Sequence, residues 1–120
     1  MGSEDLANIP EISIDELAKL NLKKICLVDV REKYEFIEMR VPGAKLLPLS
    51  EVPENLAAFP TDSPVYLICA SGNRSGVAGD FLAEHKIDAI NVAGGTKGWV
   101  MSGNVYLQGD DDLPLFVGQE

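Results

Sequence analysis

A cysteine stands at the point where an apolar segment of this chain gives way to a polar loop. Cys69 follows the apolar run 65–68 and opens the sequence Cys-Ala-Ser-Gly-Asn-Arg-Ser, in which Arg74 is the only charged side chain. The run is typical of a buried strand. From Gly76 onward the apolar residues have helical spacing, so we expect a helix to begin near Arg74 or Ser75. Ligands of α/β sheets bind at the carboxyl ends of strands. The loop is therefore the first candidate for chemistry.

The residue types in this loop favour a reactive thiolate. Gly72 and Asn73 accept positive φ, so successive N–H groups can turn inward as an anion-binding nest, and the following helix adds the positive end of its dipole. Such surroundings lower a thiol pKa from about 8.5 to roughly 3.5–7.5. A thiolate prepared in this way needs no general base, which suits a chain whose only histidine is His85, about a dozen residues along the helix. A Cys-His pair is not expected here.

The elements around the loop predict an α/β fold. Two segments, 25–30 and 64–70, read as continuously apolar buried strands, and strands and helices alternate along the chain. This pattern is typical of a parallel sheet covered on both faces. Further strands are expected near 11–12, 44–49 and 89–92, and helices over 14–20, 31–38, 50–59, 76–85 and 96–103. Ser13 and Glu16 have the spacing of a capping box at the start of the first helix.

Several conspicuous side chains are expected in the core. At helical spacing, one buried face would consist of Val77, Ala78, Phe81 and Leu82, and the aromatic residues Tyr34, Phe36 and Trp99 read as packing residues. Cys26 lies inside an apolar strand, where packing is the expected role rather than that of a resolving thiol. His85 is expected at the surface near a helix end.

Composition narrows the classes of function. The chain has 120 residues, enough for one domain, and its 19 acidic and 10 scattered basic residues give a net charge of −9, which argues against nucleic acid as a partner. No apolar stretch approaches the roughly 20 residues that cross a bilayer, and no secretory signal is expected at the start. Two separated cysteines with one histidine show no metal-ligand spacing, so we expect no metal, no cofactor and a reducing cytoplasm.

Four motifs in order resemble the single-domain rhodanese family of sulfurtransferases. They are Asp29-Val-Arg31 followed by Glu35-Phe36, the segment Val-Pro-Gly-Ala at 41–44 with Leu-Pro-Leu after it, the Cys69 loop, and Gly94-Gly95 followed by Trp99. The resemblance implies about five parallel strands flanked by helices, in a domain over residues 1–105. It also implies a mechanism in which the Cys69 thiolate attacks a sulfane sulfur and carries it as a persulfide. An acceptor thiol, cyanide or protein then removes that sulfur.

The same resemblance implies roles for the residues around Cys69. The loop would cradle the persulfide through its N–H groups and the Arg74 side chain, which involves Ala70, Ser71, Gly72, Asn73, Arg74 and Ser75. Asp29, Arg31 and Glu35 are expected to fix the loop rather than to react. Arg40 stands where the family often has His, and is expected either at the mouth of the site or on the surface.

Loop length helps to choose among related activities. Cys69 and Arg74 enclose four residues, whereas related phosphatases and arsenate reductases carry five, a wider cradle for a tetrahedral oxyanion. This favours sulfur transfer. The alternative is a persulfide relay or protein-interaction module with little turnover of small molecules.

Charge suggests which donors and partners suit the chain. Because Ala70 adds no charge to the loop, weak binding of dianionic thiosulfate is expected, with a protein or small-molecule persulfide as donor. The acidic surface, including a tail over 106–120 expected to pack loosely or not at all, would suit a basic protein partner.

Overall fold

The computed structural model describes residues 9–117. Its five strands form one parallel sheet in the order β1-β5-β4-β2-β3. The strands are β1 (Glu11–Ile12), β2 (Cys26–Asp29), β3 (Lys45–Leu46), β4 (Val65–Ile68) and β5 (Ala89–Val92). The expected α/β architecture with a five-stranded parallel sheet is confirmed.

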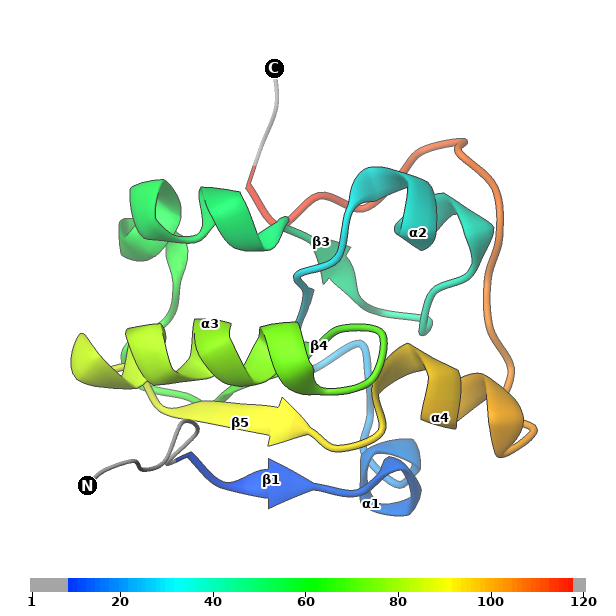
Figure 1. The fold of residues 1–120 in the computed structure, drawn as a ribbon, viewed down its shortest axis with the longest axis horizontal. Coiled ribbons are helices and arrows are strands. Elements are labelled where there is room, and N and C mark those ends of the chain that lie inside the picture. Colours follow the sequence, from blue (N-terminus) through cyan, green and yellow to red (C-terminus); the bar gives the residue numbers. More distant parts are fainter. Residues whose placement is uncertain (1–8, 118–120) are drawn as a thin grey trace.

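Helices connect the strands and cover both faces of the sheet (Figure 1). They are α1 (Ile14–Ala18), α2 (Lys33–Glu38), α3 (Asn73–Glu84) and α4 (Gly95–Met101), with the 3₁₀ helices η1 (Leu49–Glu51) and η2 (Pro53–Ala58). The capping box at the start of α1 is present, since the Ser13 N–H donates to Glu16 and the Glu16 N–H donates to the Ser13 hydroxyl. No helix in the described part of the chain is long and apolar enough to cross a membrane.

Side chains alternate along the central strands and so build two cores. Val28 of β2 and Leu67 of β4 pack in the core that includes Leu82 of α3, whereas Leu27 and Ile68 face the core formed with α1, α2 and α4. This is the two-residue period of an extended chain. Cys69, directly after β4, belongs to the core on the α3 side. The pleat therefore directs its sulfur toward the start of α3.

The helix that follows the loop differs from the expectation in one side chain. Ala78 and Leu82 are buried against the sheet, but Val77 is 52% exposed. The helix begins at Asn73, slightly earlier than expected, after Gly72 with a φ of +111°. Val77 instead lines an apolar cavity of about 250 Å³ between α3 and the 3₁₀ helices.

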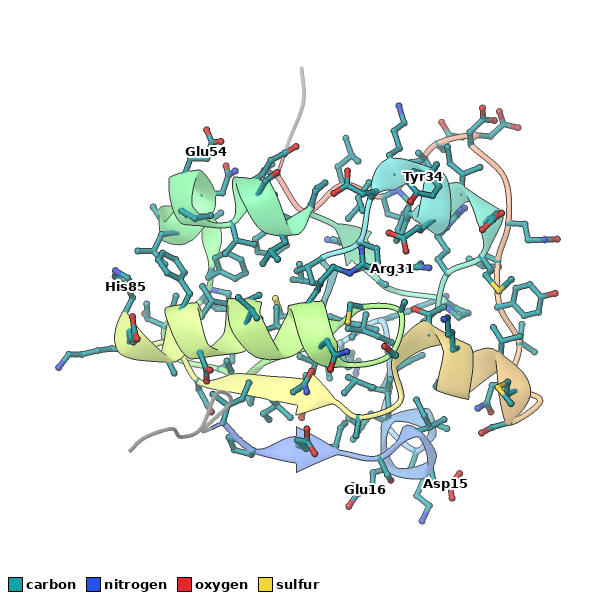
Figure 2. All side chains as sticks on the ribbon, in the orientation of Figure 1. Asp15, Glu16, Arg31, Tyr34, Glu54 and His85 are labelled. Carbon is teal, nitrogen blue, oxygen red and sulfur yellow. The ribbon has the colours of Figure 1, made fainter. Side chains whose placement is uncertain are left out.

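The other packing expectations hold with one exception. Phe36 and Trp99 are buried and Cys26 is half-buried against the core, as expected. Tyr34 is 70% exposed, because it lies on the outer side of α2 (Figure 2). His85 is exposed at the C-terminal end of α3, far from the loop (Figure 2).

The C-terminal segment is held against the domain, so the expectation of a loosely packed tail is wrong for residues 106–117. Leu107 and Arg40 exchange backbone hydrogen bonds, and Leu46 of β3 donates to Pro114 and accepts from Phe116. The Phe116 ring lies 4.7 Å from the Phe59 ring between centroids. The segment thereby supplies partners to the edge strand β3, which would otherwise present unpaired backbone groups. Residues 118–120 lie outside the described residues.

Arg40 takes part in holding the C-terminal segment. Both expectations for it, a place at the mouth of the site or on the surface, are therefore wrong. Its side chain is buried, and Nη1 donates to the carbonyl of Gly109 at 2.8 Å and to that of Phe36 at 3.2 Å. The guanidinium also stacks over the Phe36 ring, 5.1 Å from its centroid. Arg40 therefore fastens the C-terminal segment to α2.

Candidate active site

Cys69 lies at the carboxyl end of β4, with its sulfur enclosed by the loop that follows. The Gly72 N–H donates to Sγ at 3.1 Å, and the Ser75 hydroxyl oxygen lies 3.3 Å from Sγ. The residue is only 1% exposed. The chain thus folds back on the thiol within six residues, and the positive φ of Gly72 permits that reversal.

The loop lowers the pKa of the Cys69 thiol. Burial acts in the opposite direction and is the largest single influence, because it penalises the charged thiolate. It is outweighed by hydrogen bonds to sulfur from the Ser75 hydroxyl and from the N–H groups of Ser75, Gly72 and Ser71. The net direction is the one that nucleophilic chemistry at this sulfur requires.

The start of α4 anchors the other side of the loop. The N–H groups of Thr96 and Lys97 donate to the carbonyls of Cys69 and Ala70, at 2.8 and 3.0 Å. A Cβ on Gly95 would lie 2.5 Å from each of these carbonyl oxygens. Only glycine therefore allows α4 to approach the loop this closely.

Arg74, the one charged side chain of the loop, is engaged by Glu35 of α2. Its Nη1 and Nη2 donate to the two carboxylate oxygens at 2.8 and 2.9 Å. The hydrogen bond from Arg74 is the main cause that lowers the pKa of Glu35 to about 2, and the same pairing raises the pKa of Arg74. The Arg74 charge is thus neutralised by Glu35, and the Arg74 side chain is not among the residues that line the cavity of about 130 Å³ beside the loop.

Asp29 and Arg31 form a second pair directly after β2. The Arg31 guanidinium donates to both Asp29 oxygens, at 2.8 to 3.1 Å, and to the Met39 carbonyl at 2.7 Å. Burial raises the pKa of the Asp29 carboxyl, and the hydrogen bonds from Arg31 oppose that shift. Arg31 lies between α2 and the loop before α3 (Figure 2). The pair joins the end of β2 to the end of α2 beside the loop.

Asn91 is a residue of the site that the sequence reasoning missed. It lies in β5, is 3% exposed, and its side-chain oxygen is 2.5 Å from the Ser75 hydroxyl oxygen. Its amide nitrogen donates to Glu11 and to the Gly72 carbonyl. A polar residue inside an otherwise apolar buried strand was the available signal, because buried amides need hydrogen-bond partners.

A cavity of about 130 Å³ adjoins the loop, and Ala70, Thr96 and Lys97 form one side of it. Arg31, Glu35, Glu38 and Met39 form the other side. A larger cavity of about 430 Å³ lies between β3, η1 and the C-terminal segment. Of these two cavities, the smaller one borders the cysteine loop.

Comparison with known proteins places this chain in a family. The Rhodanese-like domain model matches residues 13–102. The structure of a rhodanese-like domain protein from Staphylococcus aureus is 35% identical, with a TM-score of 0.71, and the match covers 89% of this chain and 98% of that one.

Two curated relatives are similar in sequence. The uncharacterized protein YqhL of Bacillus subtilis is 37% identical over 71% of this chain and 68% of its own length. The thiosulfate sulfurtransferase GlpE of Tolumonas auensis is 28% identical over 78% of this chain and 91% of its own length. Because the family model spans residues 13–102 and the five parallel strands agree with it, this chain belongs to the rhodanese-like domain family.

Proposed function

We propose that this protein is a sulfurtransferase that carries a sulfane sulfur on Cys69. The observation that carries the proposal is the enclosure of Sγ by hydrogen-bond donors, which lower the thiol pKa. The family match and relatives named as sulfurtransferases support sulfur transfer in general. With thiosulfate as donor, the thiolate attacks the outer sulfur and the S–S bond of thiosulfate breaks. Sulfite leaves with the bonding electron pair, and a Cys69 persulfide anion remains.

The loop would then stabilise the charge of the persulfide. Of the N–H groups from Ala70 to Ser75 that we propose for this cradle, those of Ser71, Gly72 and Ser75 already hydrogen-bond Sγ, the Gly72 N–H at 3.1 Å. Oriented backbone donors in a buried site stabilise negative charge without reorganisation. An acceptor thiol, cyanide or a protein thiolate takes the outer sulfur by attack on it, which restores the Cys69 thiolate.

The charge around the loop favours a persulfide donor over thiosulfate. Glu35 neutralises Arg74 and Asp29 neutralises Arg31, so neither guanidinium offers an unmatched charge to a dianion. The net charge of −9 adds long-range repulsion. We therefore propose a small-molecule or protein persulfide as the physiological donor.

A second candidate function is a relay of persulfide between proteins with little small-molecule turnover. It is favoured by the 1% exposure of Cys69, because a thiol so enclosed reacts only when the loop opens or a partner docks over it.

The experiment that tests the proposal is intact-mass measurement after incubation with thiosulfate or with a small-molecule persulfide. One added sulfur that cyanide removes is expected on the parent and on Cys26→Ser, and none on Cys69→Ser. An adduct that persists on folded Cys69→Ser would refute the assignment of the cysteine. Absence of an adduct with either donor would exclude the small-molecule enzyme and leave the protein relay, which a persulfidated protein donor then tests.

A further inference from the structure

A buried hydrogen-bond chain runs from the Cys69 sulfur through Ser75 to Asn91. The Ser75 oxygen lies 3.3 Å from Sγ and 2.5 Å from Asn91 Oδ1. All three residues are at most 3% exposed, so bulk water has little access to them. The positions of the protons in this chain therefore bear directly on the charge of the sulfur.

The orientation of the Asn91 amide is determined by its other neighbours. Its Nδ2 lies 3.1 Å from Glu11 Oε2 and 3.2 Å from the carbonyl oxygen of Gly72. A carbonyl oxygen and an ionised carboxylate only accept hydrogen bonds, so the reversed amide would place oxygen against two acceptors. Asn91 Oδ1 consequently faces Ser75 and needs a proton from it.

Ser75 has one hydroxyl proton and two neighbours that can take it. When the proton points to Asn91, the Ser75 oxygen presents a lone pair to sulfur, which suits a protonated thiol donating to it. When Cys69 is a thiolate, the hydroxyl can add its hydrogen bond to those of the N–H groups only by turning toward sulfur, and the buried Asn91 oxygen then loses its donor. Leaving a buried acceptor without a partner is unfavourable.

We propose that Asn91 is a positioning residue that competes with the Cys69 thiolate for the Ser75 proton and so favours the sulfur-loaded site over the free thiolate. Loading moves the negative charge from Sγ to the outer sulfur, one bond away. The Ser75 proton is then free to return to Asn91. This step rests on the proposed function and on its stoichiometry: thiolate and thiosulfate give persulfide anion and sulfite.

The first test measures the thiol pKa and does not depend on sulfur transfer. The rate of Cys69 alkylation by iodoacetamide is followed against pH in the Cys26→Ser background, where Cys69 is the only thiol. Asn91→Ala should lower the thiol pKa by about one unit, because the Ser75 proton becomes fully available to the thiolate. Charged groups near the loop are unchanged in this variant: Arg74, Glu35, Asp29, Arg31, Lys97 and Glu11.

The matched control makes the Asn91→Ala substitution in a protein that lacks the Ser75 hydroxyl. In a Ser75→Ala background, Asn91→Ala should leave the thiol pKa unchanged, because no proton remains to compete for. An equal drop in both backgrounds would mean that Asn91 acts by holding the Gly72 carbonyl, and it would overturn the proposal. No drop in either background would overturn it as well.

The second test measures loading at equilibrium. At a pH above the thiol pKa and a fixed ratio of sulfite to thiosulfate, Asn91→Ala should reduce the ratio of loaded to free protein about tenfold, the counterpart of one pKa unit. Equal loading of parent and variant would refute the preference for the loaded state. If the parent takes up no sulfur from any donor, the proposed function fails, and the alkylation result alone decides whether Asn91 competes for the proton.

Discussion

Glu35 and Arg74 are 39 residues apart in the chain and form an ion pair with two hydrogen bonds, which joins α2 to the first turn of α3. The positive charge of Arg74 is therefore already neutralised by Glu35 before any substrate arrives. A bidentate pair of this kind fixes the guanidinium in one orientation. Glu35 thus sets both the position of Arg74 and the electrical potential at the loop.

Removing Glu35 should make the site more attractive to anions. In the Cys26→Ser background, Glu35→Ala should raise the alkylation rate of Cys69 by anionic iodoacetate, relative to neutral iodoacetamide, roughly threefold at low salt. Glu84→Ala, which removes the same charge at the far end of α3, is the control and should leave the ratio nearly unchanged. The electrostatic role would be contradicted if Glu35→Ala gave the same ratio of iodoacetate to iodoacetamide rates as Glu84→Ala. It would also be contradicted if the increase in this ratio persisted in 1 M salt.

The same ion pair should make stability depend on pH in acid. The pKa of Glu35 is about 2 in the folded protein against an ordinary value of 4.5, so the unfolded chain takes up the proton first as the pH falls. The stabilisation is complete above pH 4.5 and is lost as the pH falls through the folded pKa of about 2. Because the Arg74 side chain is 36% exposed, solvent screening reduces the effect to about 1 kcal/mol.

Urea unfolding of the parent and of Glu35→Gln at several pH values measures this contribution. The difference in unfolding free energy should be constant near neutral pH and should shrink below pH 4.5. A difference that stays constant down to pH 2.5 would show that Glu35 has an ordinary pKa.

Gly95→Ala should destabilise the protein and disturb the loop. The new Cβ would collide with the carbonyl oxygens of Cys69 and Ala70, and the φ of +60° is strained for alanine. Strain and collision together should lower the free energy of unfolding by about 3 kcal/mol. Gly103→Ala is the control, because Gly103 also has a positive φ but has nothing within 4 Å of the new Cβ. Gly103→Ala should lower the free energy of unfolding, measured by heat or urea, by only about 1 kcal/mol. Equal losses for Gly95→Ala and Gly103→Ala would rule out the close contact at Gly95.

Phe116→Ala should show that the C-terminal segment contributes to stability. Phe116 is partly buried and packs on Phe59, so we expect a loss of about 2 kcal/mol in urea unfolding. Leu115→Ala, one residue earlier and 38% exposed, should cost less than about 1 kcal/mol. If Phe116→Ala cost no more than Leu115→Ala, the ring would not be part of the core.

The sequence alone was sufficient for the fold class, the order of the elements along the chain and the position of the cysteine loop between a strand and a helix. These depend on local information: apolar runs for β2 and β4, the capping box of Ser13 and Glu16, and the change from an apolar run to a polar loop at Cys69. Each pattern lies within a few residues, where backbone preference and burial act together. The exposure of Val77 and Tyr34 was missed because helical spacing does not define how far an apolar face extends.

Only the tertiary structure decided which groups meet around the loop. Arg74 pairs with Glu35, and Asn91 reaches Ser75 from β5 while Glu11 of β1 holds its amide. The docking of Arg40 and Phe116 with the C-terminal segment is likewise a contact between distant parts of the chain. Such contacts follow from strand order and from side-chain packing, which have no local signature in the sequence. The cysteine was therefore predictable from its neighbours in the chain, whereas the charges and protons that tune it depend on its neighbours in space.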